Sequence, residues 1–453
     1  LCRRCVTACN EIAVNGVLGF GYRGSNTTIV CDDNKPMGES TCVQCGECVQ
    51  RCPVGALTER KAMQKGRTWE LKKVRTTCPY CGVGCQLELH VKGEKIVKVT
   101  GVEDGAPNKG RLCVKGRFGY DFIYSDDRLT TPLIKENGVF REASWDEALD
   151  LVASKFKETI EKHGPDSVAG ISCARSINED SYNMQKLFRS VFKTNNIDHC
   201  ARSCHAPTVA GLRTSFGSGA MTNSFGEFSK AKLFFCIGTN MTEAHPVAAT
   251  FLKNAVRNGA KLIVVDPRRH KLADYADIYA QIKVGADVAF INGLIHILIS
   301  EGKYDKEFIE KNCVNFEEIK AKVQEYPPEK VAEISGVSVE TMHEIANLMW
   351  EIRPSMLCYT LGLTEHTCGK NNVMSTANLQ MLLGNMGKEC GGVNPLRGQN
   401  NVQGACDMAA LPNVYHGYYN VNDPASKAKF EEHWGVEGLS DKVGMMIPDM
   451  LDG

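Results

Sequence analysis

The sequence lacks an excess of charge of either sign: 53 Lys and Arg residues balance 53 Asp and Glu residues among its 453 positions. Without a basic excess, the chain has no charge footprint for nucleic acid or for an anionic membrane surface. It also lacks an uninterrupted apolar run of about 18 residues, so no membrane span is predicted. The glycine-rich residues 16–24 lack the strand–turn–helix context of a dinucleotide site, and no Walker motif occurs, which argues against directly bound NAD or ATP.

Cysteine, by contrast, is abundant. The chain holds 21 cysteines, and eleven of those in its first quarter form three sets with a recurrent spacing. Disulfide frameworks are typical of small secreted chains, whereas C-x2-C runs in a chain of this length favour metal binding. Because free thiols and exposed clusters persist in reducing surroundings, we predict a cytoplasmic location.

The first two sets follow the spacing C-x2-C-x2-C-x3-C-P, which ligates four-iron clusters in bacterial ferredoxins. The complete run comprises Cys42, Cys45, Cys48, Cys52 and Pro53. The other run shows only its last three members, Cys2, Cys5 and Cys9. Its missing cysteine would precede residue 1, so we expect the natural chain to begin further upstream. Zinc binding and free thiols are the alternatives for these runs.

In paired ferredoxin runs, the fourth cysteine of each run ligates the cluster of the other run. We therefore expect Cys9 to join Cys42, Cys45 and Cys48, and Cys52 to join Cys2 and Cys5. A third set has the spacing C-x2-C-x3-C and a later fourth member, and comprises Cys78, Cys81, Cys85 and Cys113. Zinc also uses C-x2-C pairs, but the position beside two clusters favours a third 4Fe–4S cluster. Three clusters in a row predict an electron-transfer chain that ends on a redox centre.

The sequence predicts three regions: a ferredoxin-like module at residues 1–60, a small 4Fe–4S domain at 74–125, and a large body at 126–453. The charged residues 59–73 predict a helical linker between the first two regions. In the small domain, strands are predicted near residues 87–91 and 96–99. In the body, a capping box formed by Ser144 and Glu147 predicts a helix that ends at Gly164.

The body alternates predicted strands with predicted helices. Residues 232–237 and 261–265 are apolar on both faces, as buried parallel strands are, and a helix near 247–258 separates them. Further helices are predicted near 180–192, 289–300, 338–350 and 373–383, and further strands near 167–172 and 355–361. This alternation predicts an α/β fold with a doubly wound sheet.

Two polar segments of the body carry candidate chemistry. Cys204 and His205 lie in a predicted loop that enters a helix, and a helix N-terminus favours a thiolate. The alternative for Cys204 is a small core residue. Residues 394–407 form a polar, rigid segment that contains Arg397, whose planar fork suits a carboxylate.

With these segments the chain resembles the catalytic subunit of molybdenum or tungsten bis-pterin formate dehydrogenases. The resemblance covers residues 74–453, and residues 1–60 resemble the front end of longer members. Its motifs are CPYCGVGC, CVKG, CARSCHAPTVAGL, GTNMTEAHP, VDPRR, VGAD and NPLRGQNNVQGACDMAALPNVYHGY. The family also has a C-terminal β-rich domain, which would lie beyond residue 453.

The resemblance implies a role for each matched residue. Cys204 would ligate Mo or W, His205 would relay the proton, Arg397 would hold formate, and Lys115 would lie between a cluster and one pterin. Many members carry selenocysteine at the position of Cys204. The expected contacts to two molybdopterin guanine dinucleotides are Arg175, Asn240, Glu243, Asp266, Arg268, Gly285, Asp287, Gly362 and Gln399. For Asp266, which follows the apolar strand 261–265, an ordinary aspartate at a strand end is the alternative.

The resemblance implies interconversion of formate and CO2, with electrons passed through three 4Fe–4S clusters to a partner subunit. That partner would carry flavin or further clusters, use NAD or ferredoxin, or be a hydrogenase. Another molybdopterin reductase, such as a nitrate reductase, is one alternative. An iron–sulfur scaffold subunit like that of NADH dehydrogenase is the non-enzymatic alternative. Neither nucleic acid nor a membrane is an expected partner, and the choice between Mo and W stays open.

Overall fold

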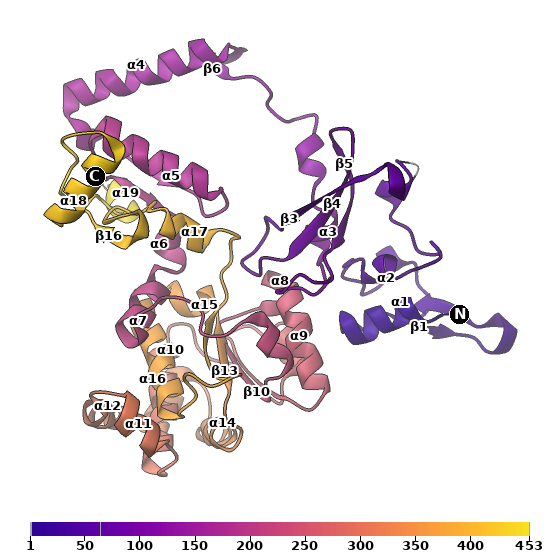
Figure 1. The fold of residues 1–453 in the computed structure, drawn as a ribbon. Helices are drawn as coiled ribbons and strands as arrows, with labels where there is room; N and C mark the ends of the chain where they lie inside the picture. The colour runs from indigo at the N-terminus through magenta and orange to yellow at the C-terminus, as the bar shows by residue number, and fades with distance from the viewer. Residues whose placement is uncertain (1, 64, 453) are drawn as a thin grey trace. The chain divides into compact units, whose positions relative to one another are not determined.

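The computed structural model describes residues 2–63 and 65–452 (Figure 1). The chain divides into two compact units. Unit 1 combines Leu1–Gly119 with Ser203–Asn400, and unit 2 combines Tyr120–Arg202 with Asn401–Gly453. Each unit therefore joins segments that are far apart in the sequence. No helix among the described residues has both the length and the apolar composition needed to cross a bilayer.

Unit 1 begins with small elements that support the first two cysteine runs. They are α1 (Arg4–Thr7), the π-helical turn η1 (Ala8–Ile12), the antiparallel hairpin of β1 (Leu18–Gly21) and β2 (Thr28–Cys31), and α2 (Glu47–Gln50). Their core is small: Cys9, Val17 and Leu18 are buried, and other cysteines pack around them. We call residues 2–63 the ferredoxin-like module.

The third cysteine set belongs to an antiparallel sheet of three strands, β3 (Lys72–Thr77), β4 (Gln86–Lys92) and β5 (Lys95–Gly101), followed by α3 (Val114–Phe118). We call residues 72–119 the small cluster domain. The two strands expected here are confirmed as β4 and β5. β3, whose side chains are all exposed, was not predicted.

The predicted helical linker at 59–73 is wrong. The segment contains two single 3-10 turns, η4 (Arg60–Ala62) and η5 (Thr68–Glu70), and then enters β3 at Lys72. Gly66, with a φ of 151°, adopts a backbone conformation foreign to a helix. The charges that suggested a solvated helix instead form ion pairs, such as Lys73 with Glu88 at 2.9 Å and Lys92 with Glu70 at 2.9 Å.

The rest of unit 1 is built on a parallel sheet of five strands. In spatial order they are β12 (Ile278–Ala280), β11 (Lys261–Val265), β10 (Leu233–Ile237), β13 (Met356–Tyr359) and β14 (Gly392–Pro395). Every neighbouring pair is parallel. The chain runs outward from β10 in one direction and then returns to its other side, so the doubly wound α/β prediction is confirmed. Such a sheet binds ligands where the order reverses, at the carboxyl ends of β10 and β13.

Helices enclose this sheet, and both of its faces are buried. Alternate residues such as Phe235, Ile263 and Leu357 join a hydrophobic core with the helices, whereas Phe234 and Val264, on the opposite face, are also fully buried. The helices are α7 (Ala206–Phe216), α9 (Pro246–Arg257), α10 (Asp287–Ser300), α11 (Lys306–Asn312), α12 (Phe316–Lys322), α13 (Pro328–Ser335), α14 (Val339–Glu351) and α16 (Gly369–Leu382). Short helices α6 (Ala201–Cys204), α8 (Met241–Ala244) and α15 (Leu361–Thr364) lie near the carboxyl ends of strands or beside α7.

Unit 2 is smaller and has short strands. Its strands are β6 (Leu133–Glu136), β7 (Val139–Glu142), β8 (Gly170–Ser172), β9 (Ile197–His199), β15 (Val414–Tyr415) and β16 (Tyr419–Asn420). Its helices are α4 (Trp145–His163), α5 (Asn178–Leu187), α17 (Val402–Asp407), α18 (Pro424–Trp434) and α19 (Ile447–Asp452). The strand expected at 167–172 is shorter than predicted, because a 3-10 turn occupies Pro165–Ser167. Tyr415, Phe430 and Trp434 form an aromatic core.

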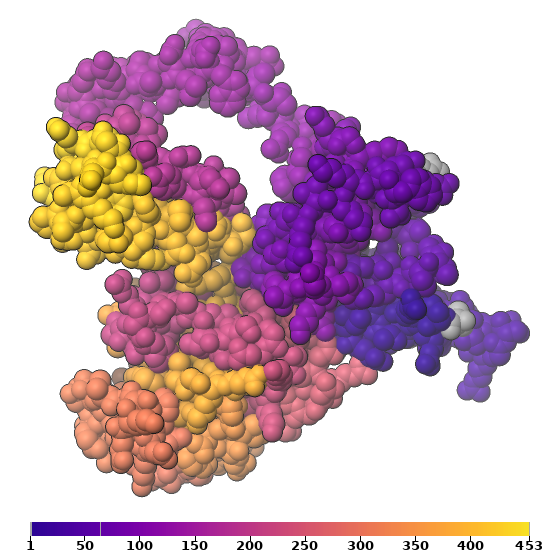
Figure 2. Space-filling model, in the orientation of Figure 1, coloured from indigo at the N-terminus to yellow at the C-terminus, as the bar shows by residue number. Residues whose placement is uncertain are grey.

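Helix α4 begins and ends where the sequence predicts. The hydroxyl of Ser144 accepts a hydrogen bond from Glu147 N, and Gly164 follows the last turn. In a full capping box the Glu147 carboxylate would also accept the backbone N–H of Ser144. Here that carboxylate binds Arg141 at 2.5 Å instead. None of the residues of α4 is buried, and Figure 2 shows this purple segment at the outer surface of the unit.

Candidate functional site

The candidate site lies at the carboxyl edge of the parallel sheet in unit 1. Asn240 follows β10, Asp266 follows β11, Asp287 opens the helix after β12, Gly362 follows β13, and Arg397 follows β14. Because parallel strands all end at the same edge, five separate segments of the chain converge there.

Two glycines allow the backbones to meet at the centre of this edge. A Cβ atom added to Gly238 would lie 2.7 Å from Gly362 C, and one added to Gly362 would lie 2.8 Å from Gly238 Cα. Gly238 also has a φ of 56°, in the left-handed region. The two loops that follow β10 and β13 therefore touch through backbone alone, at a distance that leaves no room for a side chain on either glycine.

Cys204 ends α6, two residues before the first residue of α7. Its side chain is buried, and its Sγ lies 3.7 Å from Gln399 Oε1. The Thr364 hydroxyl donates to Cys204 O at 2.6 Å, which fixes the backbone at this point. The structure thus brings together two predicted residues, Cys204 and Gln399, that are 195 positions apart.

His205 is completely buried beside Cys204. Its Nδ1 lies 3.0 Å from the hydroxyl of Thr208, to which Tyr359 Oη donates at 3.1 Å. Burial, with the nearby charge of Arg397, lowers the pKa of His205 to about 3. The imidazole is therefore neutral near pH 7, although the backbone of Leu396 acts in the opposite direction and raises the pKa.

Arg397 is held at both its side chain and its backbone. Its Nη2 donates to Gly219 O at 2.8 Å. Its carbonyl oxygen lies 2.6 Å from His245 Nε2 and accepts the backbone N–H of Gly82 at 3.1 Å. A Cβ on Gly82 would lie 2.4 Å from that oxygen, so only glycine fits there. Gly82 follows Cys81, so a cysteine loop of the small cluster domain directly supports Arg397.

The charge of Lys115 acts on the third cysteine set and also on His245. In that set it acts on Cys78, whose pKa burial nevertheless raises to about 11. The same charge acts on His245, whose pKa falls to about 4, chiefly because that ring is buried. Lys115 also lines a cavity of about 480 Å³ that contains Cys45, Cys113 and Glu243.

The other predicted contacts along this edge form a smaller group around His366. His366 Nε2 lies 3.0 Å from Gly362 O and 3.9 Å from Asp287 Oδ2. Burial raises the pKa of Asp287, and the Asp266 carboxylate contributes to the rise. Asp266 also accepts the backbone N–H of Arg268 at 2.9 Å. The side chain of Arg268 is exposed, and so is Gly285, with a φ of 85°.

Arg175 belongs to unit 2, where it follows β8 and is exposed. Its backbone N–H donates to Cys173 Sγ at 3.4 Å. Arg175 therefore remains a predicted cofactor contact, whereas the other predicted contacts all belong to unit 1.

The third cysteine set is gathered in the small cluster domain. Cys78, Cys81 and Cys85 are buried, and burial raises the pKa of Cys85 with further contributions from Cys78, Cys81 and Cys113. Thiols buried together resist ionisation, and iron ions would supply the positive charge that makes them thiolates. This grouping fits a cluster held by four cysteines.

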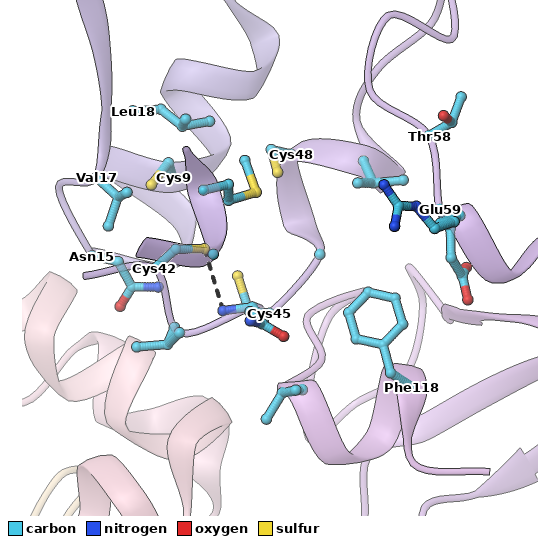
Figure 3. Close-up of a pocket in the computed structure, with 18 of the residues that line it drawn as sticks. Cys9, Asn15, Val17, Leu18, Cys42, Cys45, Cys48, Thr58, Glu59 and Phe118 are labelled. Atoms are coloured by element: carbon cyan, nitrogen blue, oxygen red, sulfur yellow. Dashed lines mark hydrogen bonds between the residues drawn. The ribbon is translucent and has the colours of Figure 1, made fainter. Parts of the chain in front are cut away.

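The ferredoxin-like module gathers Cys9 with Cys42, Cys45 and Cys48. The four line a cavity of about 800 Å³, and Figure 3 shows their sulfur atoms around its interior. Burial raises the pKa of Cys48 to about 12, with contributions from the other three thiols. This is the grouping expected for a run whose fourth cysteine crosses to the other cluster.

A second cavity of about 550 Å³ in this module is lined by Cys2 and Cys52, together with Arg3, Arg4 and Arg51. Cys5 packs against the core beside Cys9. Among the described residues, no three Cys, His, Asp or Glu side chains converge as the ligands of a single ion would. A four-iron cluster spreads its thiolates around a larger body, so the cysteine groups suit clusters better than zinc.

Several polar atoms at the carboxyl edge need a partner. Buried atoms without a hydrogen bond in the described chain include Thr239 Oγ1, Asn240 Nδ2, Asn394 Oδ1 and Asn400 Oδ1. Leaving such a group unpaired costs about 1–3 kcal/mol. With the backbone contact at Gly238 and Gly362, these atoms fit a large ligand rich in donors and acceptors, as a pterin nucleotide is.

Sequence reasoning missed the residues that support the site. His245, Thr208 and Tyr359 were not predicted, although His245 and Thr208 lie within motifs that were recognised. Pro246 at the start of α9 marks His245 as a helix-capping position, which was the available signal. Nothing in the sequence indicated that Gly82 would contact Arg397.

Family models match most of the chain. Residues 128–444 match the molybdopterin oxidoreductase model, residues 71–125 its Fe4S4 domain, and residues 1–56 a 4Fe-4S dicluster domain. The F420-dependent formate dehydrogenase 2 subunit alpha of Methanococcus maripaludis is 47% identical over 84% of this chain and 56% of its own length. Formate dehydrogenase H of Escherichia coli is 43% identical over 84% of this chain and 54% of its own length.

A third relative matches the whole chain: a probable oxidoreductase, YjgC, of Bacillus subtilis is 36% identical over 100% of this chain and 50% of its own length. Among solved structures, acetylene hydratase from Pelobacter acetylenicus matches with a TM-score of 0.62 and 29% identity, over 69% of this chain and 43% of that chain. The chain thus spans about half the length of the curated relatives it matches.

Proposed function

We propose that this chain, which belongs to the molybdopterin oxidoreductase family, forms part of the catalytic subunit of a formate dehydrogenase. The relatives named as formate dehydrogenases support this proposal, as does the grouping of Cys204, His205 and Arg397 at one sheet edge. Because the chain spans about half of those relatives, the proposal concerns the activity of the whole protein.

The family implies a molybdopterin cofactor and iron–sulfur clusters. The finer proposal is Mo or W held by two molybdopterin guanine dinucleotides, with Cys204 as the thiolate ligand. Asn240, Asp266 and Asp287, at the ends of three strands, would hold the nucleotide, with Glu243, Arg268, Gly285, Gly362, Gln399 and Arg175 as further contacts. When bound, the metal centre would supply a two-electron acceptor for formate.

Arg397 would bind the substrate. The hydrogen bond from Nη2 to Gly219 O orients the guanidinium, and the remaining N–H groups of this planar fork can pair with a carboxylate. Formate has one carbon and little else to grip, so this charge-assisted contact would supply most of its orientation.

His205 would receive the proton. Formate becomes CO2 when its C–H bond breaks, which releases one proton and two electrons. A neutral, buried imidazole can accept that proton before it reaches solvent. The low pKa means that His205 would pass the proton on rather than retain it.

The electrons would leave through Lys115 and the cysteine sets. We propose three 4Fe–4S clusters: one at Cys78, Cys81, Cys85 and Cys113, one at Cys9, Cys42, Cys45 and Cys48, and one that involves Cys2, Cys5 and Cys52. The electrons would then reach a partner subunit that carries flavin or further clusters, or a hydrogenase. A cytoplasmic location completes the proposal.

The observation that carries the proposal is the convergence of buried Cys204, neutral His205 and tethered Arg397 at the carboxyl edge. The test compares the wild-type holoprotein with Cys204→Ser, using formate and a dye acceptor and measuring Mo, W, Se and Fe. Serine replaces a soft thiolate with a hard hydroxyl, so we expect near-complete loss of turnover while iron content stays unchanged. A Cys204→Ser enzyme that keeps its turnover, or a wild type that reduces nitrate faster than it oxidises formate, would contradict the proposal.

A further inference from the structure

One arginine contacts the cysteine loops of two modules at once. Arg117 lies in α3, and its backbone N–H donates to Cys113 O at 3.1 Å. Its side chain crosses into the ferredoxin-like module, where Nε donates to Cys45 O at 2.6 Å. Cys113 belongs to the third cysteine set and Cys45 to the second, so a single residue is hydrogen-bonded to a member of each.

Each of the other two nitrogens of the Arg117 fork also has a partner, and the fork is buried. Nη2 binds Glu47 Oε1 at 2.7 Å and Nη1 binds Gln50 Oε1 at 2.6 Å. Glu47 Oε1 also accepts the backbone N–H of Leu112 at 3.1 Å, so the pair is tied to both modules. Glu47 and Arg117 are only 1% and 2% exposed. Burying such a pair is costly, which argues that its geometry rather than its contribution to stability is what matters.

The backbone of the cysteine loop is shaped to receive this side chain. Gly46, between Cys45 and Glu47, has a φ of 73° and opens α2. A Cβ on Gly46 would lie 2.1 Å from Arg117 Cδ, so a larger residue would displace the arginine. Gln50 provides a second contact between the two modules, because its Oε1 accepts a hydrogen bond from Gly101 N at 3.0 Å.

Electrostatics points to the same place. The positive charge of Arg117 acts on the thiols of Cys45 and Cys48, both members of the set around the 800 Å³ cavity. A fixed charge next to a cluster is one of the means by which a protein adjusts the cluster's reduction potential. Here the charge belongs to a residue of the small cluster domain.

We propose that Arg117 is a positioning residue for electron transfer, which fixes the spacing of two clusters and links them through the hydrogen bonds to Cys113 and Cys45. The proposal deepens the proposed function and rests on its cluster assignments. In each transfer, one electron leaves the cluster of the Cys113 set and one enters the cluster of the Cys45 set. No bond forms or breaks, and Arg117 keeps its proton throughout.

The experiment uses the holoprotein and electron paramagnetic resonance of its reduced clusters. Two variants test the spacing: Arg117→Lys keeps the charge but loses the fork, and Arg117→Met with Glu47→Gln removes both buried charges together, which avoids an unpaired carboxylate. Arg141→Met is the matched control, because Arg141 pairs with two glutamates at an exposed position. Iron content shows whether each variant retains its clusters.

We expect both Arg117 variants to lose the magnetic coupling between the two reduced clusters and to slow reduction of the second cluster after rapid mixing with formate. Arg141→Met should match the wild type. Glu47→Gln leaves the positive charge uncompensated and should shift the potential of the cluster at Cys45 to more positive values, which a merely structural role would not do. Unchanged coupling, transfer rate and potential in variants with full iron content would overturn the proposal. A wild type that shows no cluster signals would instead overturn the proposed function.

Discussion

The parallel sheet of unit 1 and the ferredoxin-like module hold their functional residues by different means. Strands β10, β11 and β13 are buried on both faces, and their apolar side chains join an extended core. The ferredoxin-like module has only a small hydrophobic cluster, Cys9, Val17 and Leu18, and one member of it is itself a cysteine of the cluster set. Hydrophobic burial therefore positions much of the carboxyl edge, whereas the module depends on the group that its cysteines bind.

The two regions also differ in what they leave unsatisfied. Within the part of the chain that the structure describes, polar atoms of the sheet edge such as Thr239 Oγ1 and Asn240 Nδ2 have no hydrogen-bond partner. In the module, burial raises the pKa of the Cys45 thiol to about 11, so this thiol needs a positive partner to ionise. A pterin nucleotide rich in donors and acceptors would satisfy the first region, and cationic iron would satisfy the second. Loss of iron should therefore affect the ferredoxin-like module, and loss of the pterin should affect the sheet edge.

Iron removal should separate the two regions by the largest effect. Stripping the clusters anaerobically with a chelator should unfold residues 2–63, because their binding free energy supplies much of the module's folding free energy. Hydrogen exchange read by mass spectrometry should then show full exchange in this module and retained protection at β10 and β11. Equal loss of protection in both regions would contradict the account.

Substitution of Arg397 tests the carboxyl edge of the sheet and leaves the cysteine sets unchanged. Losing a charge-assisted partner in a buried site costs about 2–5 kcal/mol, which corresponds to roughly 30- to several-thousand-fold in kcat/KM. We expect Arg397→Leu to show this loss with formate, and Arg397→Lys, which keeps the charge, to show a smaller one. Metal analysis should give wild-type Mo or W and Fe in both, and normal formate kinetics in Arg397→Leu would remove Arg397 from substrate binding.

The buried histidine of unit 2 predicts a pH effect that does not involve any cluster. His199 is fully buried, with Nε2 3.3 Å from Cys406 Sγ, and burial lowers its pKa from 6.5 to about 4. Between these two pH values, His199 therefore binds a proton in the unfolded chain but stays neutral in the folded chain. The resulting stability is fully present above pH 6.5 and is lost as the pH falls towards 4.

Between pH 7 and pH 5 this loss is on the order of 1–2 kcal/mol. Thermal unfolding at the two pH values should show that His199→Asn narrows the difference in melting temperature. His163→Gln, at the exposed end of α4, is the control and should leave the difference unchanged. If His199→Asn and the wild type lose the same stability on acidification, the buried histidine is not the group that titrates.

A smaller effect is expected from the backbone contact to Arg397. His245→Ala removes the hydrogen bond from Nε2 to Arg397 O, whose loss is worth about 1 kcal/mol. We expect kcat/KM for formate to fall roughly five- to tenfold. His245→Gln, whose amide can donate to the same oxygen, should recover part of it. Equal kinetics in the alanine and glutamine variants would show that the hydrogen bond does not position Arg397.

The fold was predictable where one pattern dominates. The apolar segments 232–237 and 261–265 became β10 and β11 because strands buried on both faces need no alternation. The prediction of a helical linker at 59–73 failed because charge alone does not distinguish a solvated helix from turns and a strand whose charges form cross-strand ion pairs. The roles proposed for Cys204 and Arg397 rest on family motifs, whereas the topology of the sheet explains why the two segments meet.

The supporting contacts were beyond prediction because they join distant segments. The contact of Gly82 with Arg397 O spans 315 positions, and that of Arg117 with Cys45 O crosses two modules. Local patterns carry no information on such pairs, since a glycine or an arginine has the same local preferences wherever its partner lies. These contacts are visible only once the backbone brings the cysteine loops against the sheet.

The central claim is that formate delivers electrons at the sheet edge and that the cysteine sets carry them away. Anaerobic titration of the oxidised holoprotein with formate, followed by electron paramagnetic resonance and by CO2 release, tests this claim most directly. The account predicts that formate reduces the clusters and that one CO2 appears for every two electrons taken up. Clusters that dithionite reduces but formate leaves oxidised, in a protein loaded with Mo or W, would contradict it.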